Sequence, residues 1–260
     1  NYARMKKEKK MSSRFRALVI VSIVSAASMT YAADNRVLAL DGVNDSVVVP
    51  YSLQIVLPYL EDISLTTWFK FTNSLPATET AIFSFNDAYT LSYLGSSDGR
   101  IRLRFHGTGG TFHSTSNSWQ VGRWYHFGIT WQKSTTNGIV YIDGSQNTTT
   151  IDWGRRYDSQ TNFYMGRFSW TAGGYMKGCI DDITLWEKKI SDIELSQTMR
   201  KGLNGSEAGL VAWWNFDDST ANDASTNNHD GTFQNGATTI VDNFLSPEIQ
   251  SITPQWAAAF

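Results

Sequence analysis

The sequence predicts an all-β protein of short antiparallel strands, arranged as a sandwich or a barrel. Three observations support this prediction: apolar and polar residues alternate with a period of two in several runs, turn residues bound each run, and almost no segment has the longer period of a helix. The chain of 260 residues contains 20 glycines and 5 prolines. About 200 residues can form one domain of this kind.

Three runs show the alternation most clearly, and each predicts a strand with one face toward the core. They span residues 63–71, 101–105 and 125–131, with residues 63, 65, 67, 69 and 71 on the inward face of the first. Turn residues separate the runs at 96–99, 134–138 and 143–144, and the Asp-Gly of the last turn is typical of a tight hairpin.

One helix is expected among the strands. Ser191 and Glu194 have the spacing of a capping box, and Gly202 lies where a helix that ends near Lys201 needs a glycine. Another strand-rich segment, 209–219, follows this helix. The sequence thus predicts one short helix in an otherwise all-β domain.

The first 33 residues have the pattern of a secretory signal peptide. Basic residues precede a short apolar run at 17–29, and small residues follow at 30–33. The run is well short of the ~20 residues that span a bilayer. We therefore expect a cleaved leader, no remaining membrane span, and a secreted or cell-surface protein; a retained anchor is the alternative.

The remaining chain is predicted to hold one domain and a short tail. Residues 34–245 form the domain, and the tail, 246–260, contains "SPEIQSITPQ". This stretch resembles the first strand of Ig-like modules in bacterial surface proteins, so it is interpreted as a linker or the start of such a module. A docked or disordered tail is the alternative.

Charge and cysteine content exclude some classes of function. Without the leader, 15 basic residues face 23 acidic ones, a net charge of −8. Nucleic acid is an unfavourable partner because phosphate contacts need clustered basic residues, whereas divalent cations or neutral glycans suit this charge. The single cysteine, Cys179, excludes an intramolecular disulfide and multi-cysteine metal sites, and is interpreted as a small buried hydrophobe.

Five sequence blocks follow one another between residues 34 and 240. They are "LALDGVNDSVVVP" (38–50), "ISLTTWFKF" (63–71), "VGRWYHFGITWQ" with "NGIVYIDGS" (121–145), "GYMKGCIDDITLWEKKISDIEL" (174–195) and "GLVAWWNFDDST" with "NNHDGT" (209–232). Together they resemble the laminin G-like, concanavalin A-like lectin-glucanase jelly-roll family. The resemblance implies a two-sheet antiparallel jelly-roll sandwich, often calcium-bound, that binds glycans or proteins. Fold by itself does not settle function.

Asp181 and Asp182 pose a question, because adjacent strand residues point to opposite faces. Simple alternation places Asp181 on one face with Cys179, Ile183 and Leu185, and Asp182 on the other. A carboxylate beside apolar neighbours is costly unless it has a partner. A charged partner is therefore expected.

Calcium is the first candidate for that partner. The resemblance implies a structural Ca2+ that joins the first hairpin to this strand, which carries over to Asp41 and Asp182, with Asn44 or backbone carbonyls completing the shell. Calcium takes six to eight oxygen ligands and suits an exported domain. The alternatives are ion pairs with lysine or arginine, or a position in water at a strand end. The aspartate-rich loop 215–231 is either a second calcium site or a solvated loop.

The sequence predicts a binding domain and not an enzyme. Jelly-roll glycosidases need paired carboxylates in a cleft, usually as Glu-x-Asp-x-x-Glu on one strand of this fold, and the sequence lacks that triplet. The four histidines have no metal-ligand spacing, and His126 is expected to be a hydrogen-bonded structural residue.

Ten tryptophans favour a carbohydrate ligand, since flat aromatic faces suit sugar rings. Two segments, 106–119 and 152–175, are predicted to form long loops at one rim, where aromatic residues accompany arginines and Asn162. The candidate ligand-binding residues are Trp119, Trp153, Arg155, Arg156 and Trp170. Tryptophans of this fold are often core residues, which is the alternative for each.

These observations give three functional hypotheses. The first is an exported carbohydrate-binding, lectin-like module, stabilised by calcium, within a larger modular protein. The second is a cell-adhesion domain that binds extracellular or cell-surface proteins. The third is a structural spacer.

Overall fold

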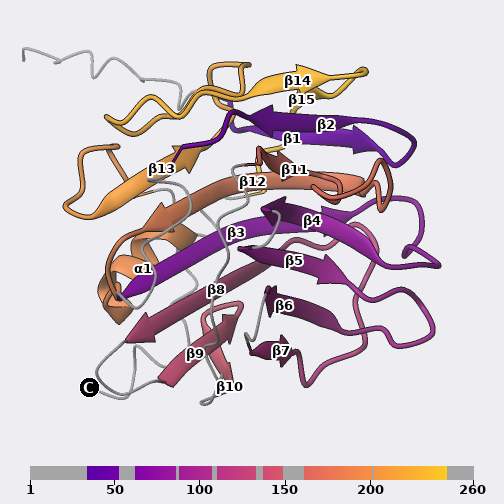
Figure 1. Cartoon of the computed structure of the whole chain (residues 1–260), viewed down its shortest axis with the longest axis horizontal. Coiled ribbons are helices and arrows are strands. Elements are labelled where there is room, and N and C mark those ends of the chain that lie inside the picture. The colour runs from indigo at the N-terminus through magenta and orange to yellow at the C-terminus, as the bar shows by residue number, and fades with distance from the viewer. Residues whose placement is uncertain are drawn as a thin grey trace, which may run out of the picture. The chain divides into compact units, whose positions relative to one another are not determined.

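The computed structural model describes residues 34–52, 62–85, 88–106, 110–132, 137–148, 161–200 and 202–244. These residues form two antiparallel sheets packed as a sandwich, with a single short helix among them (Figure 1). The predicted all-β sandwich is confirmed. The predicted signal peptide and the tail 246–260 lie outside the described residues.

The eight-stranded sheet has the order β10-β9-β8-β3-β12-β1-β15, and β13 pairs with β12 off this path. Its strands are β1 (Arg36–Asp41), β3 (Ile63–Phe71), β8 (Tyr125–Gln132), β9 (Asn137–Ile142), β10 (Ser145–Thr148), β12 (Lys177–Trp186), β13 (Leu210–Trp214) and β15 (Thr238–Val241).

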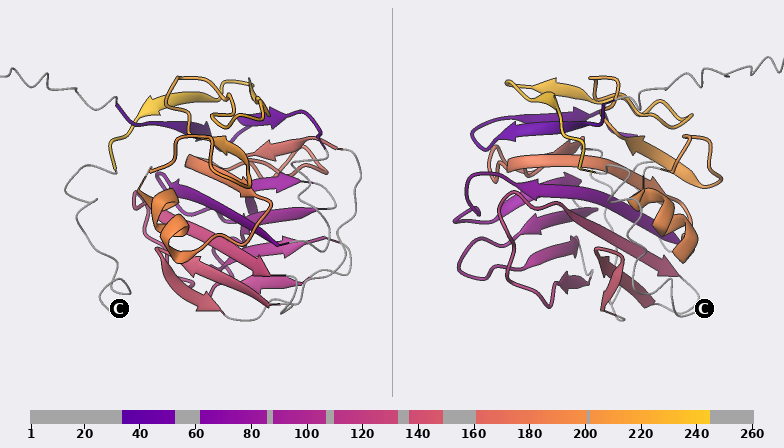
Figure 2. Two further views of the ribbon diagram at one scale, coloured as in Figure 1. Left: turned by 90° about the vertical axis from the view of Figure 1, so that its left-hand side faces the viewer. Right: turned by 180° about the vertical axis from the view of Figure 1, so that it is seen from behind.

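The seven-stranded sheet has the order β14-β2-β11-β4-β5-β6-β7. Its strands are β2 (Ser46–Val49), β4 (Thr80–Phe85), β5 (Tyr89–Tyr93), β6 (Ile101–Phe105), β7 (Thr111–His113), β11 (Phe163–Met165) and β14 (Thr232–Gln234). In the left view of Figure 2, these strands lie on the right and those of the other sheet on the left.

The predicted alternation is confirmed where the two sheets meet. The inward apolar residues of 63–71, 101–105 and 125–131 are buried in one core cluster, together with Trp214. Aromatic side chains fill much of this core; the ring of Trp214, for example, stacks on Phe163. Burial of each large apolar side chain stabilises the fold by roughly 1.5–3 kcal/mol.

The helix α1 (Asp192–Met199) begins where the sequence predicts. Ser191 caps it, and Glu194 completes the capping box. At the other end, Gly202 N–H donates to the Gln197 carbonyl. Leu195 of the helix belongs to a second apolar cluster with Trp186, so α1 covers part of the outer face of the eight-stranded sheet (Figure 2). Within the described residues, no helix is long and apolar enough to cross a membrane.

The predicted alternation fails in β12, which contains a β-bulge. Asp181 lies opposite Trp68 of β3, but Thr184 lies opposite Thr66, so Asp182 and its neighbour Ile183 together face one residue. Asp182 has φ 46°, a left-handed conformation that aspartate tolerates better than most residues.

The bulge exchanges the two faces of β12. Ile180 points into the core before it, and Ile183 and Leu185 point into the core after it. Cys179 and Asp181 therefore lie on the outer face, and the expectation that they share a face with Ile183 is corrected. Cys179 is buried, as expected.

Candidate functional site

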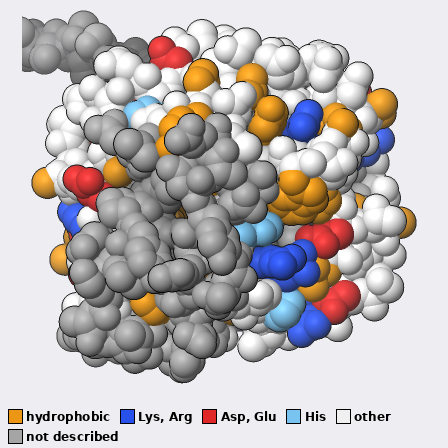
Figure 3. Space-filling model, in the orientation of Figure 1, with side chains coloured by type: hydrophobic (Ala, Val, Ile, Leu, Met, Phe, Trp, Pro, Cys, Tyr) orange, Lys and Arg blue, Asp and Glu red, His pale blue; other side chains and the backbone are white. Residues whose placement is uncertain are grey.

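One row of side chains crosses the outer face of the seven-stranded sheet. Residues directly opposite each other in antiparallel strands share a face. The registers align Thr232, Val48, Tyr164, Ser84, Thr90, Arg104 and Thr111, each opposite the next. Figure 3 shows this side of the molecule, where basic, acidic and histidine side chains gather beside hydrophobic ones.

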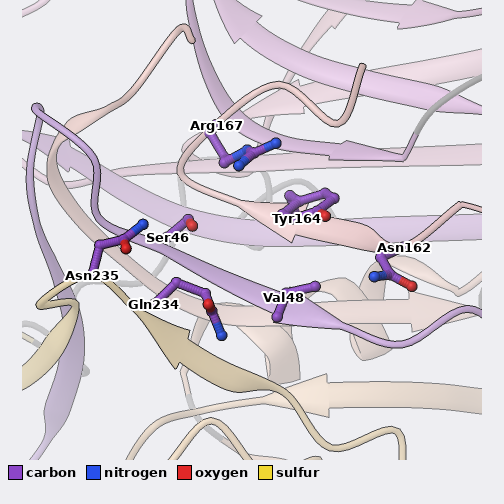
Figure 4. Close-up of a pocket in the computed structure, with 7 residues that line it drawn as sticks. All are labelled: Ser46, Val48, Asn162, Tyr164, Arg167, Gln234 and Asn235. Carbon is purple, nitrogen blue, oxygen red and sulfur yellow. The ribbon is translucent and has the colours of Figure 1, made fainter. Parts of the chain in front are cut away.

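A polar pocket lies near one end of this row. It has a volume of about 260 Å³ and is lined by Ser46, Val48, Asn162, Tyr164, Arg167, Gln234 and Asn235 (Figure 4). These residues come from β2, from β11 and its flanking turns, and from the end of β14. Tyr164 is the aromatic member, Arg167 is the charged member, and neither aspartate nor glutamate is among the seven.

Contacts with surrounding residues hold the lining in place. The side-chain oxygen of Asn162 accepts the Tyr51 backbone N–H at 3.1 Å. On the opposite side, the Asn235 amide donates to the Asn44 carbonyl at 3.0 Å. Gln234 makes no side-chain hydrogen bond within the described residues, so its half-buried amide is available to a ligand. Ser46 also makes none but is buried.

Arg167 is fixed over aromatic rings. Its guanidinium carbon lies 4.3 Å from the ring centre of Tyr164 and 5.9 Å from that of Tyr175. Its Nε donates to the Phe168 carbonyl at 2.9 Å. These contacts orient the planar guanidinium beside the pocket, with its two terminal nitrogens left for other partners.

Trp170, one of the predicted ligand residues, lies on the same loop as Arg167. It is 45% exposed and stacks on Phe168, with 4.5 Å between the ring centres. Its other ring neighbour is His106, at 5.3 Å. Ser169 ties this loop to Ser84 of β4 through a hydroxyl contact of 2.8 Å. Trp170 is thus an exposed aromatic surface on an anchored loop, and its ligand role stays a prediction.

The other predicted ligand residues do not join this site. Trp119 is 6% exposed, packs against Tyr125 with 4.7 Å between ring centres, and donates its indole N–H to the Gly99 carbonyl at 2.7 Å. Because its ring faces the core and its N–H has a partner, Trp119 has no free face for a sugar. Trp153, Arg155 and Arg156 lie outside the described residues.

The structure separates the residues expected to share a calcium ion. Asp41 lies opposite Lys177 in the β1–β12 register, five positions away from Asp182. Five strand positions span roughly 16 Å, so the two carboxylates and Asn44 cannot form one shell. The expected pairing of Asp41 with Asp182 is corrected.

Each of these two aspartates has a local role. Asp41 accepts the backbone N–H groups of Val43 and Asn44, at 2.7 and 3.3 Å, in the turn of the first hairpin. The Val43 contact is the main cause that lowers the pKa of Asp41. Asp182 accepts the indole N–H of Trp213 at 2.9 Å.

The loop 215–231 uses its best-buried carboxylate for hydrogen bonds. Oδ1 of Asp223 accepts the backbone N–H groups of Trp213 and Ser225, and Oδ2 accepts from the Ser225 hydroxyl and His229 N–H, all within 2.8–2.9 Å. Across the described residues, no three or more histidine, cysteine, aspartate or glutamate side chains are grouped to hold a metal. Calcium binding stays a prediction.

His126 differs from its expected role. It is fully buried, its ring meets Trp68 edge-on at 5.0 Å, and neither ring nitrogen has a hydrogen-bond partner in the described part of the chain. Burial lowers the pKa of His126 to about 3, so the ring is neutral. It acts as an apolar packing group and not as a hydrogen-bonded one.

Of the seven pocket residues, sequence reasoning singled out Asn162 and Arg167 and missed the other five: Ser46, Val48, Tyr164, Gln234 and Asn235. Arg167 and Asn162 stood within the predicted loop 152–175, whereas Gln234 and Asn235 follow the end of that loop by about sixty residues. The sequence held no alternation that marks Tyr164 as outward, because Phe163, Tyr164 and Met165 are all apolar or aromatic; the outward position of Tyr164 appears only in the structure.

Comparison with known proteins gives the family. Residues 41–196 match the sequence profile of the concanavalin A-like lectin/glucanases superfamily. This match covers more than half of the chain, so the chain belongs to that superfamily. No curated protein sequence is a match.

Solved structures support the same fold. A protein from Bacteroides ovatus, described as a candidate carbohydrate binding protein, has a TM-score of 0.65 and 18% identity over 81% of this chain and 61% of its own. The chain thus spans less than two thirds of that protein. A heptameric SAP-like pentraxin from Limulus polyphemus has a TM-score of 0.54 and 12% identity, over 82% of this chain and 98% of its own. At these identities the likeness shows the fold alone.

Proposed function

We propose that this chain is a glycan-binding domain whose binding site is the pocket around Tyr164. The observation that carries the proposal is the composition of the pocket: one half-buried tyrosine among amide and hydroxyl side chains, of which Asn162 and Asn235 are already held in place. Amide groups both donate and accept hydrogen bonds, as sugar hydroxyls do. The tyrosine ring offers an apolar face to a sugar ring.

Binding without hydrolysis fits the same lining. Glycosidases use a pair of carboxylates that flank the scissile bond, and none of the seven lining residues carries a carboxylate. Membership in the lectin/glucanase superfamily is compatible with either activity. The absence of acidic residues from the lining therefore favours a binding site.

The wider proposal is an exported module of a longer protein, with calcium as a stabilising ion. The signal-like leader at 1–33 supports export, and the tail at 246–260 supports a modular context. For calcium, the support is the family resemblance together with the acidic first hairpin, Asp41 and Asp45. Trp170 adds an exposed aromatic surface close to Arg167 in the chain.

A glycan array tests this function directly. The purified chain is applied in millimolar calcium and again in EDTA, and the dissociation constant of the best glycan is then measured by calorimetry. Loss of binding in EDTA supports calcium at or near the site, whereas unchanged binding leaves a metal with at most a structural role. No glycan binding in either condition overturns the proposal and shifts attention to protein partners.

Two variants and a matched control locate the site. Tyr164→Ala is expected to weaken glycan binding about 10-fold, because it removes the aromatic face (~1.4 kcal/mol per tenfold). Gln234→Ala is expected to weaken it several-fold. Gln146→Ala, an exposed glutamine of β10 in the other sheet, serves as the control. Circular dichroism confirms that each variant folds, and unchanged affinity in both pocket variants would rule out this pocket.

A further inference from the structure

Within the described residues, four arginines lie on the outer side of the seven-stranded sheet, although the chain after residue 33 carries a net charge of −8. Along β6, arginines alternate with core residues, so Arg102 and Arg104 both point outward, and Arg100 immediately precedes the strand. Arg167 adds a fourth arginine on this side. Composition averages over the whole chain, whereas a ligand meets the charge of one face.

Two of these four arginines already have carboxylate partners. Arg100 forms an ion pair with Asp98 at 2.7 Å, and Arg102 forms one with Glu79. Arg104 and Arg167 have no carboxylate within ion-pair distance in the described part of the chain. Among the described residues, the face therefore carries two cations that form no ion pair with a carboxylate.

Arg167 is the better placed of the two to bind an anion. Tyr164, Tyr175 and the Phe168 carbonyl fix its guanidinium, and its terminal nitrogens have no hydrogen-bond partner in the described residues. Its planar array of donors matches a carboxylate or a sulfate. A guanidinium fixed before binding loses little conformational freedom on pairing with an anion.

Arg104 extends this basic character along the sheet. The register connects Tyr164 to Arg104 through Ser84 and Thr90, so the two are three strands apart. At about 4.8 Å per strand this is roughly 14 Å. Ser84 and Thr90 are themselves buried, against Ser169 and His106 respectively, so an extended ligand that begins in the pocket would pass over these covering residues to approach a second cation.

From this geometry we infer that the pocket selects acidic glycans, with a sugar carboxylate or sulfate paired to Arg167. The inference rests on the proposed glycan-binding function and narrows its ligand class. Acidic glycans thereby take the place of the neutral glycans that the net charge suggested as ligands. Arg104 contributes a weaker, longer-range attraction to anionic groups further along the ligand.

Matched oligosaccharides test the ligand class. The probes are oligogalacturonate and its methyl ester, which differ in the carboxylate charge, and chondroitin oligosaccharides with and without sulfate. The chain is expected to bind at least one charged probe about 10-fold or more tightly than its uncharged or less charged counterpart. A difference within the oligogalacturonate pair indicates a carboxylate ligand, and a difference within the chondroitin pair indicates a sulfate ligand. Raising the salt concentration from 50 to 500 mM should weaken the charged interaction several-fold.

Variants of Arg167 test the contact itself. Arg167→Gln is expected to weaken binding of the charged probe about 10- to 100-fold, and Arg167→Lys, which keeps the charge but loses the planar donors, less. Arg123→Gln is a matched control, because Arg123 also lies over a tyrosine ring, Tyr125 at 4.7 Å, but pairs with Asp143.

Each result separates the inference from the function on which it rests. If the uncharged probes bind as tightly as the charged ones, and Arg167→Gln has no effect, the acidic-glycan inference is overturned while glycan binding stands. If no probe binds and the array is also negative, both fail. Equal losses in Arg123→Gln and Arg167→Gln would indicate non-specific attraction and would also overturn the inference.

Discussion

The outer faces of the two sheets use their polar residues in different ways. On the eight-stranded sheet, Asp181, Asp182 and His126 are at most 2% exposed and pack beside Trp68 and Trp213. On the seven-stranded sheet, the pocket residues Tyr164, Arg167 and Gln234 are partly exposed, and Trp170 is 45% exposed. Asp181, Asp182 and His126, which draw attention in the sequence, are thus buried, while ordinary polar residues form the candidate site.

The aspartate pair shows why a conspicuous motif can be structural. Oδ1 of Asp181 accepts the backbone N–H of Asp182 at 2.9 Å, and Oδ2 accepts the Asn35 amide at 3.3 Å. Asp182 accepts the indole N–H of Trp213. Buried carboxylates are tolerated when donors contact them, and at this bulge the hydrogen bonds reach both oxygens of Asp181 and Oδ1 of Asp182.

The largest expected effect comes from the bulge. Asp182→Val places a β-branched residue at positive φ and leaves the buried Trp213 indole N–H without its acceptor. We expect a loss of about 3–5 kcal/mol in the free energy of unfolding. Asp182→Asn should lose far less, since asparagine tolerates this backbone and keeps an acceptor. Urea denaturation measures both, and similar losses in the two variants would contradict this account.

The pH dependence of stability tests the burial of His126 on the outer face of the eight-stranded sheet. His126 has an ordinary pKa of 6.5 that burial lowers to about 3 in the folded protein. Between these values the unfolded chain binds the proton and the folded chain does not, so the contribution of His126 to stability is present above pH 6.5 and is lost as pH falls.

We therefore compare the chain with His126→Phe, which keeps a ring but cannot titrate. The difference in unfolding free energy between the two proteins should change by about 1.4 kcal/mol per pH unit between pH 6 and pH 4, with the variant favoured at low pH. The carboxylates of the chain change the unfolding free energy of both proteins alike, so their contribution cancels in the difference. Parallel stability curves over this range would show that His126 is not buried as the structure places it.

A smaller loss of stability is expected at helix α1, which covers part of the eight-stranded sheet. Ser191→Ala removes the acceptor for the Glu194 backbone N–H, at 3.3 Å, and opens the capping box. The expected loss is about 1 kcal/mol. Ser145→Ala, an exposed serine of β10, is the control and should change stability by less than about 0.5 kcal/mol.

The smallest change in stability is expected at Trp170, on the outer side of the seven-stranded sheet. Trp170→Ala should cost at most about 1 kcal/mol, because the indole is 45% exposed. Under the proposed function it should weaken glycan binding about 3- to 10-fold through loss of a stacking surface. Unchanged affinity would show that Trp170 lies outside the binding site, while a large loss of stability would show that the loop is structural.

The sequence by itself determined the fold class and the main elements. Strands 63–71, 101–105 and 125–131 follow from alternation, and the start of α1 follows from Ser191 and Glu194. These signals are local, because the backbone period and the capping contacts depend on residues only a few positions apart. The five sequence blocks indicated the superfamily for the same reason: each is a contiguous stretch.

Tertiary structure decided the rest. The bulge at Asp182 exists only in register with β3, and the pocket joins residues from 46 to 235 that no spacing rule connects. Trp119 lies in a turn-rich segment but turns its ring into the core. Composition gave a net charge of −8, yet strand pairing placed Arg104 on the outer face of the seven-stranded sheet, and the turn after β11 placed Arg167 beside the pocket on the same side. The physical reason is that strand register, burial and local charge arise from pairing between distant segments, and adjacent residues do not encode that pairing.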